Sequence, residues 1–173
     1  SFDVPFVFDD VDAILNNRDV RQLWPPSVAL GASRDLPVSG RPLVSLSLAV
    51  NYALGEYRVA GYHAFNLLVH VLNGWLLFAL VRRAARSEGL ALAVAAAWSV
   101  HPLISEAVVY VVQRTELMVS AFALGALYCA ARGFEAAERP GRRGAWHALS
   151  VVALAGGAVG KEKAIDVPPS GRG

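Results

Sequence analysis

The chain has 173 residues, the length of one ordinary domain, but its composition is 55% hydrophobic and only 17% charged. Soluble domains of this size spread their charges over the surface, whereas here the charges collect in short clusters between long apolar runs. The composition therefore favours a membrane protein. The formal net charge of +2 is too small to support nucleic acid as a partner, so we expect none.

Residues 1–60 predict a loop outside the membrane that carries short surface helices. Asp9 and Asp10 precede a short apolar-periodic run at residues 11–15, a position typical of a helix N-terminus. A second apolar run, residues 42–54, is too short to cross a membrane and contains serine and asparagine. This pattern predicts a helix that lies along the membrane surface.

Residues 61–163 predict a membrane bundle of helices. Its clearest apolar stretch has about the length needed to cross a hydrocarbon core. The second stretch is interrupted by His101-Pro102, which predicts one span with a broken end. The last two are short, so interfacial helices remain an alternative to spans. The predicted spans are, in order, residues 62–81, 90–112, 116–132 and 145–160. The predicted fold class is an all-α, polytopic membrane helical bundle.

The arginines predict the orientation of this bundle, because Lys and Arg in short loops stay on the cytoplasmic side. They gather in two predicted loops, with Arg82, Arg83 and Arg86 in the first and Arg132, Arg139, Arg142 and Arg143 in the second. Residues 1–60 are then expected on the non-cytoplasmic side. Because the chain lacks an initiator Met and a signal peptide, and residues 164–173 read as a truncated tail, we expect a fragment that has lost an earlier span.

The acidic cluster of Asp9, Asp10 and Asp12 is the first candidate for chemistry. Adjacent helical residues point about 100° apart, so one carboxylate could act as a general base while its neighbour supports it. The alternative is a solvated N-cap that complements the helix dipole. A metal-diphosphate site is a weaker reading, because only one such cluster is present and its spacing departs from that signature.

The second candidate is a polar stripe in the first predicted span. His63, Asn66, His70 and Asn73 follow one another at spacings of three, four and three, so they share one helical face. Such side chains face a bundle interior or a wet cavity rather than lipid. They form either a wall beside a substrate or lipid-phosphate site or a set of hydrogen bonds between helices.

The third candidate is the break at His101-Pro102. A helix that resumes at Ser105 would place Glu106 on the same face as Arg114. Glu106 could orient His101 or bind a sugar hydroxyl, or it could form a structural ion pair with Arg114. The spacing of His101 and Glu106 does not match a zinc signature, so we predict no structural zinc.

The last candidate is the charged group after the fourth predicted span, Lys161, Glu162 and Lys163. Lysine ammonium groups there could meet a phosphate head group. The alternative is that they only reach the membrane interface and end the helix.

In order and content, these motifs resemble the bacterial relatives of the transmembrane and tetratricopeptide-repeat O-mannosyltransferases, within the GT-C class of membrane glycosyltransferases. Nearly the whole chain is covered. The blocks that carry the resemblance are Phe8-Asp9-Asp10 with Ala13-Ile14, Arg41-Pro42-Leu43 with Asn51-Tyr52, Gly61-Tyr62-His63 with Asn66-Leu67-Leu68 and His70, His101-Pro102 with Glu106-Ala107-Val108 and Arg114-Thr115-Glu116-Leu117, and Lys161-Glu162. The chain departs from the family at Glu116, where an aspartate is usual, at Gly160, and after Val167.

The resemblance implies a membrane enzyme that transfers a sugar, mannose above all, from a polyprenyl-phosphate donor to a protein hydroxyl with inversion. It implies that Asp9 acts as the general base and that Asp10 supports it. It implies no metal ligands, and whether the reaction needs a divalent cation stays open. The expected partners are the lipid-linked sugar donor, a protein acceptor and membrane lipid. The implied substrate-binding residues are Arg41, His63, His101, Glu106, Arg114, Lys161 and Glu162. A non-enzymatic or transporter-type bundle is the alternative.

Overall fold

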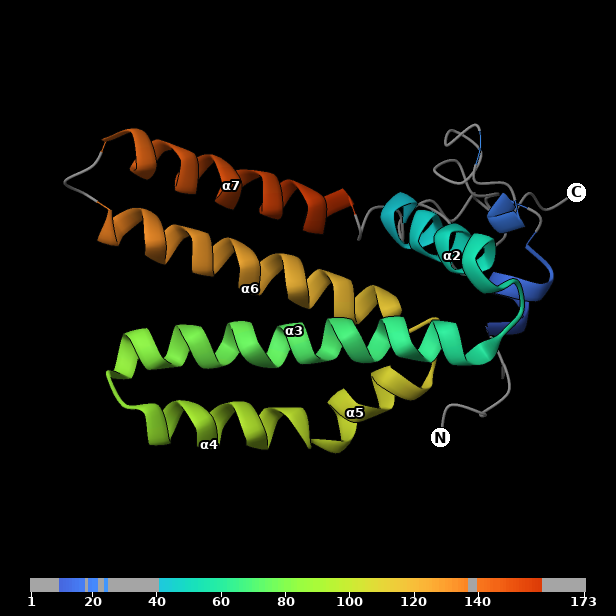
Figure 1. The fold of residues 1–173 in the computed structure, drawn as a ribbon, viewed down its shortest axis with the longest axis horizontal. Helices are drawn as coiled ribbons and strands as arrows, with labels where there is room; N and C mark the ends of the chain where they lie inside the picture. The colour runs from blue at the N-terminus through green and yellow to red at the C-terminus, as the bar shows by residue number, and fades with distance from the viewer. Residues whose placement is uncertain (1–9, 18, 22–23, 25–40, 137–139, 160–173) are drawn as a thin grey trace, which may run out of the picture.

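The computed structural model describes residues 10–17, 19–21, 24, 41–136 and 140–159, and every regular element within them is helical (Figure 1). The elements are, in order, η1 (Val11–Leu15), η2 (Asp19–Arg21), α2 (Pro42–Gly55), α3 (Val59–Ala85), α4 (Glu88–Ser99), α5 (Pro102–Val109), α6 (Arg114–Glu135) and α7 (Pro140–Val159). The prediction of an all-α chain is therefore confirmed for the described residues.

Two antiparallel hairpins form the body of the structure. Helix α3 turns back into α4, α6 turns back into α7, and α6 packs along α3 so that the hairpins lie side by side (Figure 1). Helix α2 lies at the end of the bundle where α3 and α6 begin, and it contacts both of them. We call this the α2 end. At the opposite end are the α3–α4 turn and the ends of α6 and α7 that adjoin each other.

The turn between α3 and α4 is short because each helix carries its own terminal signal. Arg86 ends α3 with φ at 52°, in the left-handed region, and its amide donates to the carbonyl of Arg82. Ser87 begins α4 as its N-cap, and its hydroxyl accepts a hydrogen bond from the amide of Leu90 at 3.3 Å. These two caps reverse the chain within a few residues.

The stretch predicted as one broken span, residues 90–112, forms two helices. Helix α4 ends at Ser99, and α5 begins at Pro102 with His101 in an extended N-cap conformation. Proline is favoured at the first position of a helix, because its φ is already helical and its missing N–H has no helical partner there. The prediction that the helix resumes at Ser105 was therefore wrong by three residues.

Among the described helices, α3 and α6 are long and apolar enough to cross a membrane. They contain 27 and 22 residues, which at a rise of 1.5 Å per residue gives lengths of about 40 and 33 Å. A hydrocarbon core is about 30 Å thick. Side chains such as Leu68, Val71 and Trp75 are exposed along α3, as expected of a surface that meets lipid.

The largest apolar cluster lies at the α2 end. It joins the two short N-terminal helices to α2, α3 and the segment before α6, and its members are Ala13, Ile14, Val20, Val44, Leu48, Tyr62 and Val111. Helix α2 is two-sided, because Leu48 is fully buried while Leu54 is 81% exposed. Burial of this cluster holds the N-terminal elements against the beginning of the bundle.

Candidate functional site

Arg114 is the centre of the α2 end. It begins α6, and its side chain is fully buried, with 0% exposure. The guanidinium donates through Nε to Asn66 Oδ1 at 2.9 Å, through Nη1 to Ser47 Oγ at 3.2 Å and through Nη2 to the carbonyl of Tyr62 at 3.2 Å. One arginine therefore joins α2, α3 and α6.

Two aromatic rings lie close to this guanidinium. Its Cζ lies 4.3 Å from the ring centroid of Phe65 and 5.7 Å from that of Tyr62, within the range of cation–π attraction. Among the described residues no carboxylate forms an ion pair with it. In particular, the predicted structural bridge to Glu106 is absent, because Arg114 is buried against neutral acceptors and Glu106 is exposed. The site thus holds a buried positive charge whose direct hydrogen-bond partners are neutral, and the buried carboxylate of Asp10 acts on it only from a distance.

Asp10 fixes the segment just before this arginine. Its carboxylate accepts a hydrogen bond from the amide of Val112 at 2.7 Å through Oδ1 and from the amide of Val111 at 3.4 Å through Oδ2. Asp10 is 2% exposed, so the reading of this residue as a solvated N-cap was wrong. Backbone amides that no helix uses are good partners for a buried carboxylate. Asp9, the predicted base, precedes Asp10 in the chain and lies outside the described residues.

Arg41 lies beside the same segment. It is the N-cap residue of α2, partly buried, and its Nη1 donates to Thr115 Oγ1 at 3.3 Å. Thr115 follows Arg114 directly, so Arg41 reaches the beginning of α6, where Arg114 is the first residue. Two of the predicted substrate-binding residues are thereby brought together.

The polar stripe of α3 faces the bundle interior, as its spacing predicted. His63, Asn66, His70 and Asn73 are all buried. Each one contacts a main-chain carbonyl of the chain that runs from α4 to α6. The pairs are His63 Nδ1 with Val108 at 3.4 Å, Asn66 Nδ2 with Tyr110 at 3.4 Å, His70 Nε2 with Ser99 at 3.2 Å and Asn73 Nδ2 with Leu117 at 2.9 Å.

Three of these carbonyls, on Ser99, Val108 and Tyr110, lie where α4 and α5 end. Carbonyls at a helix end have no intrahelical partner, and in an apolar environment such groups must be satisfied by neighbours. The stripe therefore supplies hydrogen bonds between helices, which was one of its two predicted roles. Its other predicted role, as a wall beside a substrate, stays a prediction.

Two further predicted residues, His101 and Glu106, belong to α5 and its N-cap. His101 caps α5, and Glu106 lies further along it; both side chains are exposed. Lys161 and Glu162 lie outside the described residues. No group of three or more His, Cys, Asp or Glu side chains that could hold a metal ion occurs in the part of the chain that the structure describes.

Sequence reasoning missed Ser47 and Thr115. Both are small hydroxyl residues in apolar helices, and the structure uses each as an acceptor for an arginine. The interspersed serines of residues 42–54 were a signal, but they were interpreted only as the polar side of a surface helix. A hydroxyl next to a buried guanidinium can be recognised only once the helices are placed.

Together these contacts give the α2 end a specific chemistry. A cation that is held by neutral acceptors in a poorly solvated place creates a positive potential that solvent screens weakly. Such a potential attracts a negatively charged group, and phosphate is the anion that guanidinium groups bind most directly. The arrangement is suited to anchoring an anionic part of a substrate.

The chain is similar to curated animal proteins. It is 34% identical over 132 residues to the Protein O-mannosyl-transferase TMTC3 of Mus musculus, which covers 70% of this chain and 14% of the relative. It is 35% identical over 123 residues to the Protein O-mannosyl-transferase Tmtc1 of Drosophila melanogaster, covering 65% and 14%. It is 29% identical over 194 residues to the Protein O-mannosyl-transferase TMTC4 of Homo sapiens, covering 96% and 26%.

The chain thus spans between 14% and 26% of the length of these three relatives. No family model matches it, and no solved structure does. The relatives and the two helices of crossing length together indicate a membrane protein. Because the similarity recurs across several such relatives and extends over most of this sequence, the chain belongs to the family of transmembrane and tetratricopeptide-repeat O-mannosyltransferases.

Proposed function

We propose that this chain provides the donor-binding end of a protein O-mannosyltransferase that uses a polyprenyl-phosphate sugar. The relatives are named for transfer of mannose to proteins, which supports the sugar and the acceptor. The single observation that carries the donor is Arg114, a buried guanidinium whose hydrogen-bond acceptors are all neutral. A lipid-linked sugar carries its negative charge on the phosphate, which suits such a place.

In this proposal Arg41 contacts the phosphate directly, and Arg114 contributes its positive charge without touching the phosphate. Arg114 is too deeply buried to touch a ligand, but its charge adds to the potential that Arg41 presents beside Thr115. Arg41 is only partly buried and can offer guanidinium N–H groups to phosphate oxygens. Binding and charge stabilisation are thereby divided between two residues.

The proposed transfer step uses Asp9 as general base. The carboxylate takes the proton from an acceptor hydroxyl while that oxygen attacks the anomeric carbon of the donor. The bond between this carbon and the phosphate oxygen breaks, polyprenyl phosphate leaves with the electron pair, and the configuration inverts. Asp10 acts as a positioning residue, because its bonds to Val111 and Val112 tie the acidic segment to the beginning of α6.

We propose that the reaction takes place on the non-cytoplasmic side, in a multi-pass arrangement of GT-C type. The arginine-rich α3–α4 turn and the arginine-rich first turn of α7 lie at one end of the bundle, and the α2 end lies at the other (Figure 1). If those turns are cytoplasmic, as basic loops usually are, the α2 end is on the opposite side of the membrane.

The test is sugar transfer by the full-length natural protein in membranes supplied with a polyprenyl-phosphate mannose and a protein acceptor. Asp9→Asn is expected to abolish transfer, while Asp3→Asn, a matched change in the same segment, leaves it unaltered. Arg41→Gln is expected to raise the KM for the donor about tenfold or more, since it removes a charged contact to phosphate. Full transfer by Asp9→Asn would remove this residue from the mechanism, and an unchanged donor KM in Arg41→Gln would remove the phosphate site.

The transporter-type alternative gains no support from the stripe on α3. A passage for a polar substrate needs polar side chains that line open space. The four side chains of the stripe are buried and are engaged with main-chain carbonyls instead. The transfer assay in membranes also distinguishes the two functions. A transferase forms a new glycosidic bond on the acceptor, whereas a transporter moves its substrate without forming one.

A further inference from the structure

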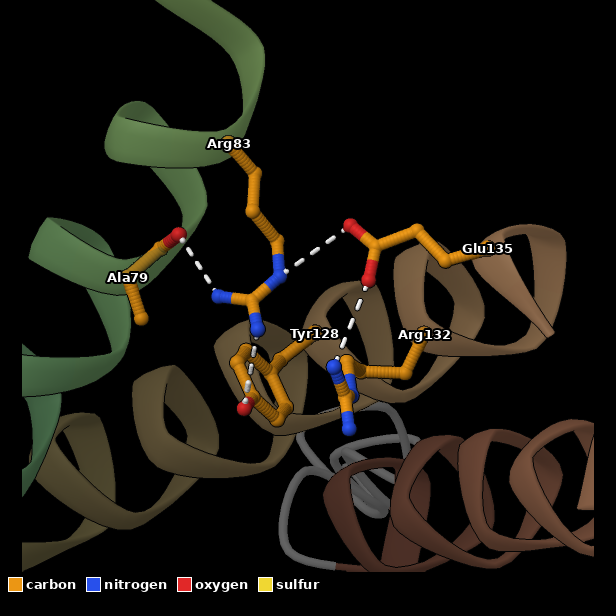
Figure 2. A network of polar contacts seen from close by, with 5 residues as sticks. All are labelled: Ala79, Arg83, Tyr128, Arg132 and Glu135. Atoms are coloured by element: carbon orange, nitrogen blue, oxygen red, sulfur yellow. Dashed lines mark hydrogen bonds and ion pairs between the residues drawn. The ribbon is translucent and has the colours of Figure 1, made fainter. Parts of the chain in front are cut away.

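The end of the bundle opposite α2 is held together by a network of arginines. Arg83 Nε lies 3.3 Å from Glu135 Oε1, and Arg132 Nη1 lies 3.4 Å from Glu135 Oε2 (Figure 2). Arg83 also donates through Nη1 to the carbonyl of Ala79 at 3.1 Å and through Nη2 to the hydroxyl of Tyr128 at 3.4 Å. The C-terminal ends of α3 and α6 are therefore fixed side by side.

Aromatic rings form a layer next to this network. Trp75 of α3, Tyr128 of α6 and Trp146 of α7 follow one another, with ring centroids 6.0 and 6.4 Å apart. The guanidinium of Arg83 lies 4.7 Å from the ring centroid of Tyr128, and that of Arg132 lies 5.3 Å from the ring centroid of Trp146. Tryptophan and tyrosine gather where hydrocarbon gives way to head groups, so this layer marks the depth of that boundary.

Among the described residues beyond this layer, arginines outnumber acidic residues. Glu135 is shared by two arginines, and Glu88 forms an exposed pair with Arg82 at 3.5 Å. In the described ranges, Arg86, Arg142 and Arg143 have no ion-pair partner, and all three are exposed. We name these three residues the arginine triad. Arg86 comes from the α3–α4 turn, and Arg142 and Arg143 come from the first turn of α7. Both turns lie at the same end of the bundle, with α6 between α3 and α7, so the three arginines are spread across this end (Figure 1).

We propose that the arginine triad is a docking surface for the head groups of anionic phospholipids. Guanidinium groups bind phosphate oxygens in pairs, and basic side chains at a membrane boundary attract anionic lipid. The lipid, rather than a free anion, is indicated by apolar side chains beside the triad. Leu90 follows Arg86 on α4 and Leu149 follows the triad on α7, and both are exposed where acyl chains would lie. This surface is separate from the proposed transferase site at the α2 end.

The test is the affinity of the full chain for phosphatidylglycerol, titrated into neutral maltoside micelles and measured by the quenching of tryptophan fluorescence by a brominated acyl chain. The variant with Arg86→Gln, Arg142→Gln and Arg143→Gln is expected to bind about a hundredfold more weakly, because each of the three arginines contributes about fivefold. Arg58→Gln is the matched control, since Arg58 is an exposed arginine at the opposite end of α3. It is expected to bind as the unaltered chain does.

Three results would overturn the proposal. They are equal affinity of the triple variant and the unaltered chain, equal binding of phosphatidylcholine, and equal competition by soluble glycerol 3-phosphate, which carries the same phosphate without acyl chains. A second variant with lysine at the three positions keeps the charge and is expected to keep most of the affinity. If the glutamine variant loses helicity by circular dichroism, single Arg86→Gln and single Arg58→Gln decide the question by the same titration.

Discussion

Replacing Asn66 by leucine tests whether the contacts of Arg114 hold the α2 end together. Asn66 Oδ1 accepts from Arg114 Nε at 2.9 Å, and neither residue is exposed. A hydrogen bond to a charged group contributes about 1.5–3 kcal/mol. The second bond of Asn66, from Nδ2 to the carbonyl of Tyr110, is longer at 3.4 Å, and bonds between membrane helices contribute about 0.6 kcal/mol on average. Asn66→Leu should therefore lower the free energy of unfolding by about 2–3.5 kcal/mol.

The loss of stability in Asn66→Leu depends on the buried charge of Arg114, so it should be smaller when that charge is removed. Arg114→Met removes the guanidinium, so no buried donor loses its acceptor when Asn66→Leu is added. The second substitution should then lower the free energy of unfolding only slightly. A double-mutant cycle is expected to give a coupling free energy of about 1.5–3 kcal/mol. Asn51 provides the control, because its side chain donates to the carbonyl of Gly61 rather than meeting Arg114.

The assay is reversible unfolding of the full chain in mixed micelles of rising dodecyl sulfate fraction, followed by circular dichroism. The cycle between Asn51→Leu and Arg114→Met should be additive within about 0.5 kcal/mol. If the cycle between Asn66 and Arg114 is additive to the same degree, the hydrogen bond carries no stability and the reasoning about the buried cation fails.

Three further predictions concern local contacts. Asp10→Asn replaces a carboxylate by an amide of weaker acceptor strength, so the amide of Val112 should exchange its hydrogen at least about tenfold faster by NMR; unchanged protection would contradict the proposed clamp. Gly133→Ala places a Cβ 2.8 Å from an imidazole carbon of α7 and should lower the free energy of unfolding by about 1–3 kcal/mol, whereas Gly125→Ala meets no atom within 4 Å and should be neutral or stabilising. A Gly133 variant as stable as the Gly125 variant would show that α6 and α7 adjust freely. Ser87→Ala removes the N-cap of α4 and should cost about 1 kcal/mol in the same unfolding assay, and a loss near zero would mean that the cap is dispensable.

The periodicity of α3 could be read from the sequence because it depends on neighbours alone. Polar residues at spacings of three and four must share a face, and that face proved to be buried. The hydrogen-bond partners of this face could not be predicted from the sequence. Its partners are carbonyls on Ser99, Val108, Tyr110 and Leu117, and these become available only where helices end or approach.

The two errors at the candidate site have the same physical origin. Asp10 was considered only as a solvated N-cap of the short helix that follows it. Its carboxylate instead accepts hydrogen bonds from amides that are 101 and 102 residues away in the chain. An ion pair of Arg114 with Glu106 was one of the alternatives, because a helix that resumes at Ser105 would place both residues on one face. In the structure three neutral oxygens from α2 and α3 bind Arg114, and no local pattern in the sequence reports their approach.

The length of α4 has a consequence for how the chain enters a membrane. Its 12 residues extend only about 18 Å, little more than half of a hydrocarbon core. Its last carbonyl, on Ser99, is satisfied by His70 of α3, and Ser87 and Arg86 close the turn that joins the two helices. Helix α4 therefore has no stable place in lipid by itself, and we expect the insertion machinery to release α3 and α4 as one hairpin.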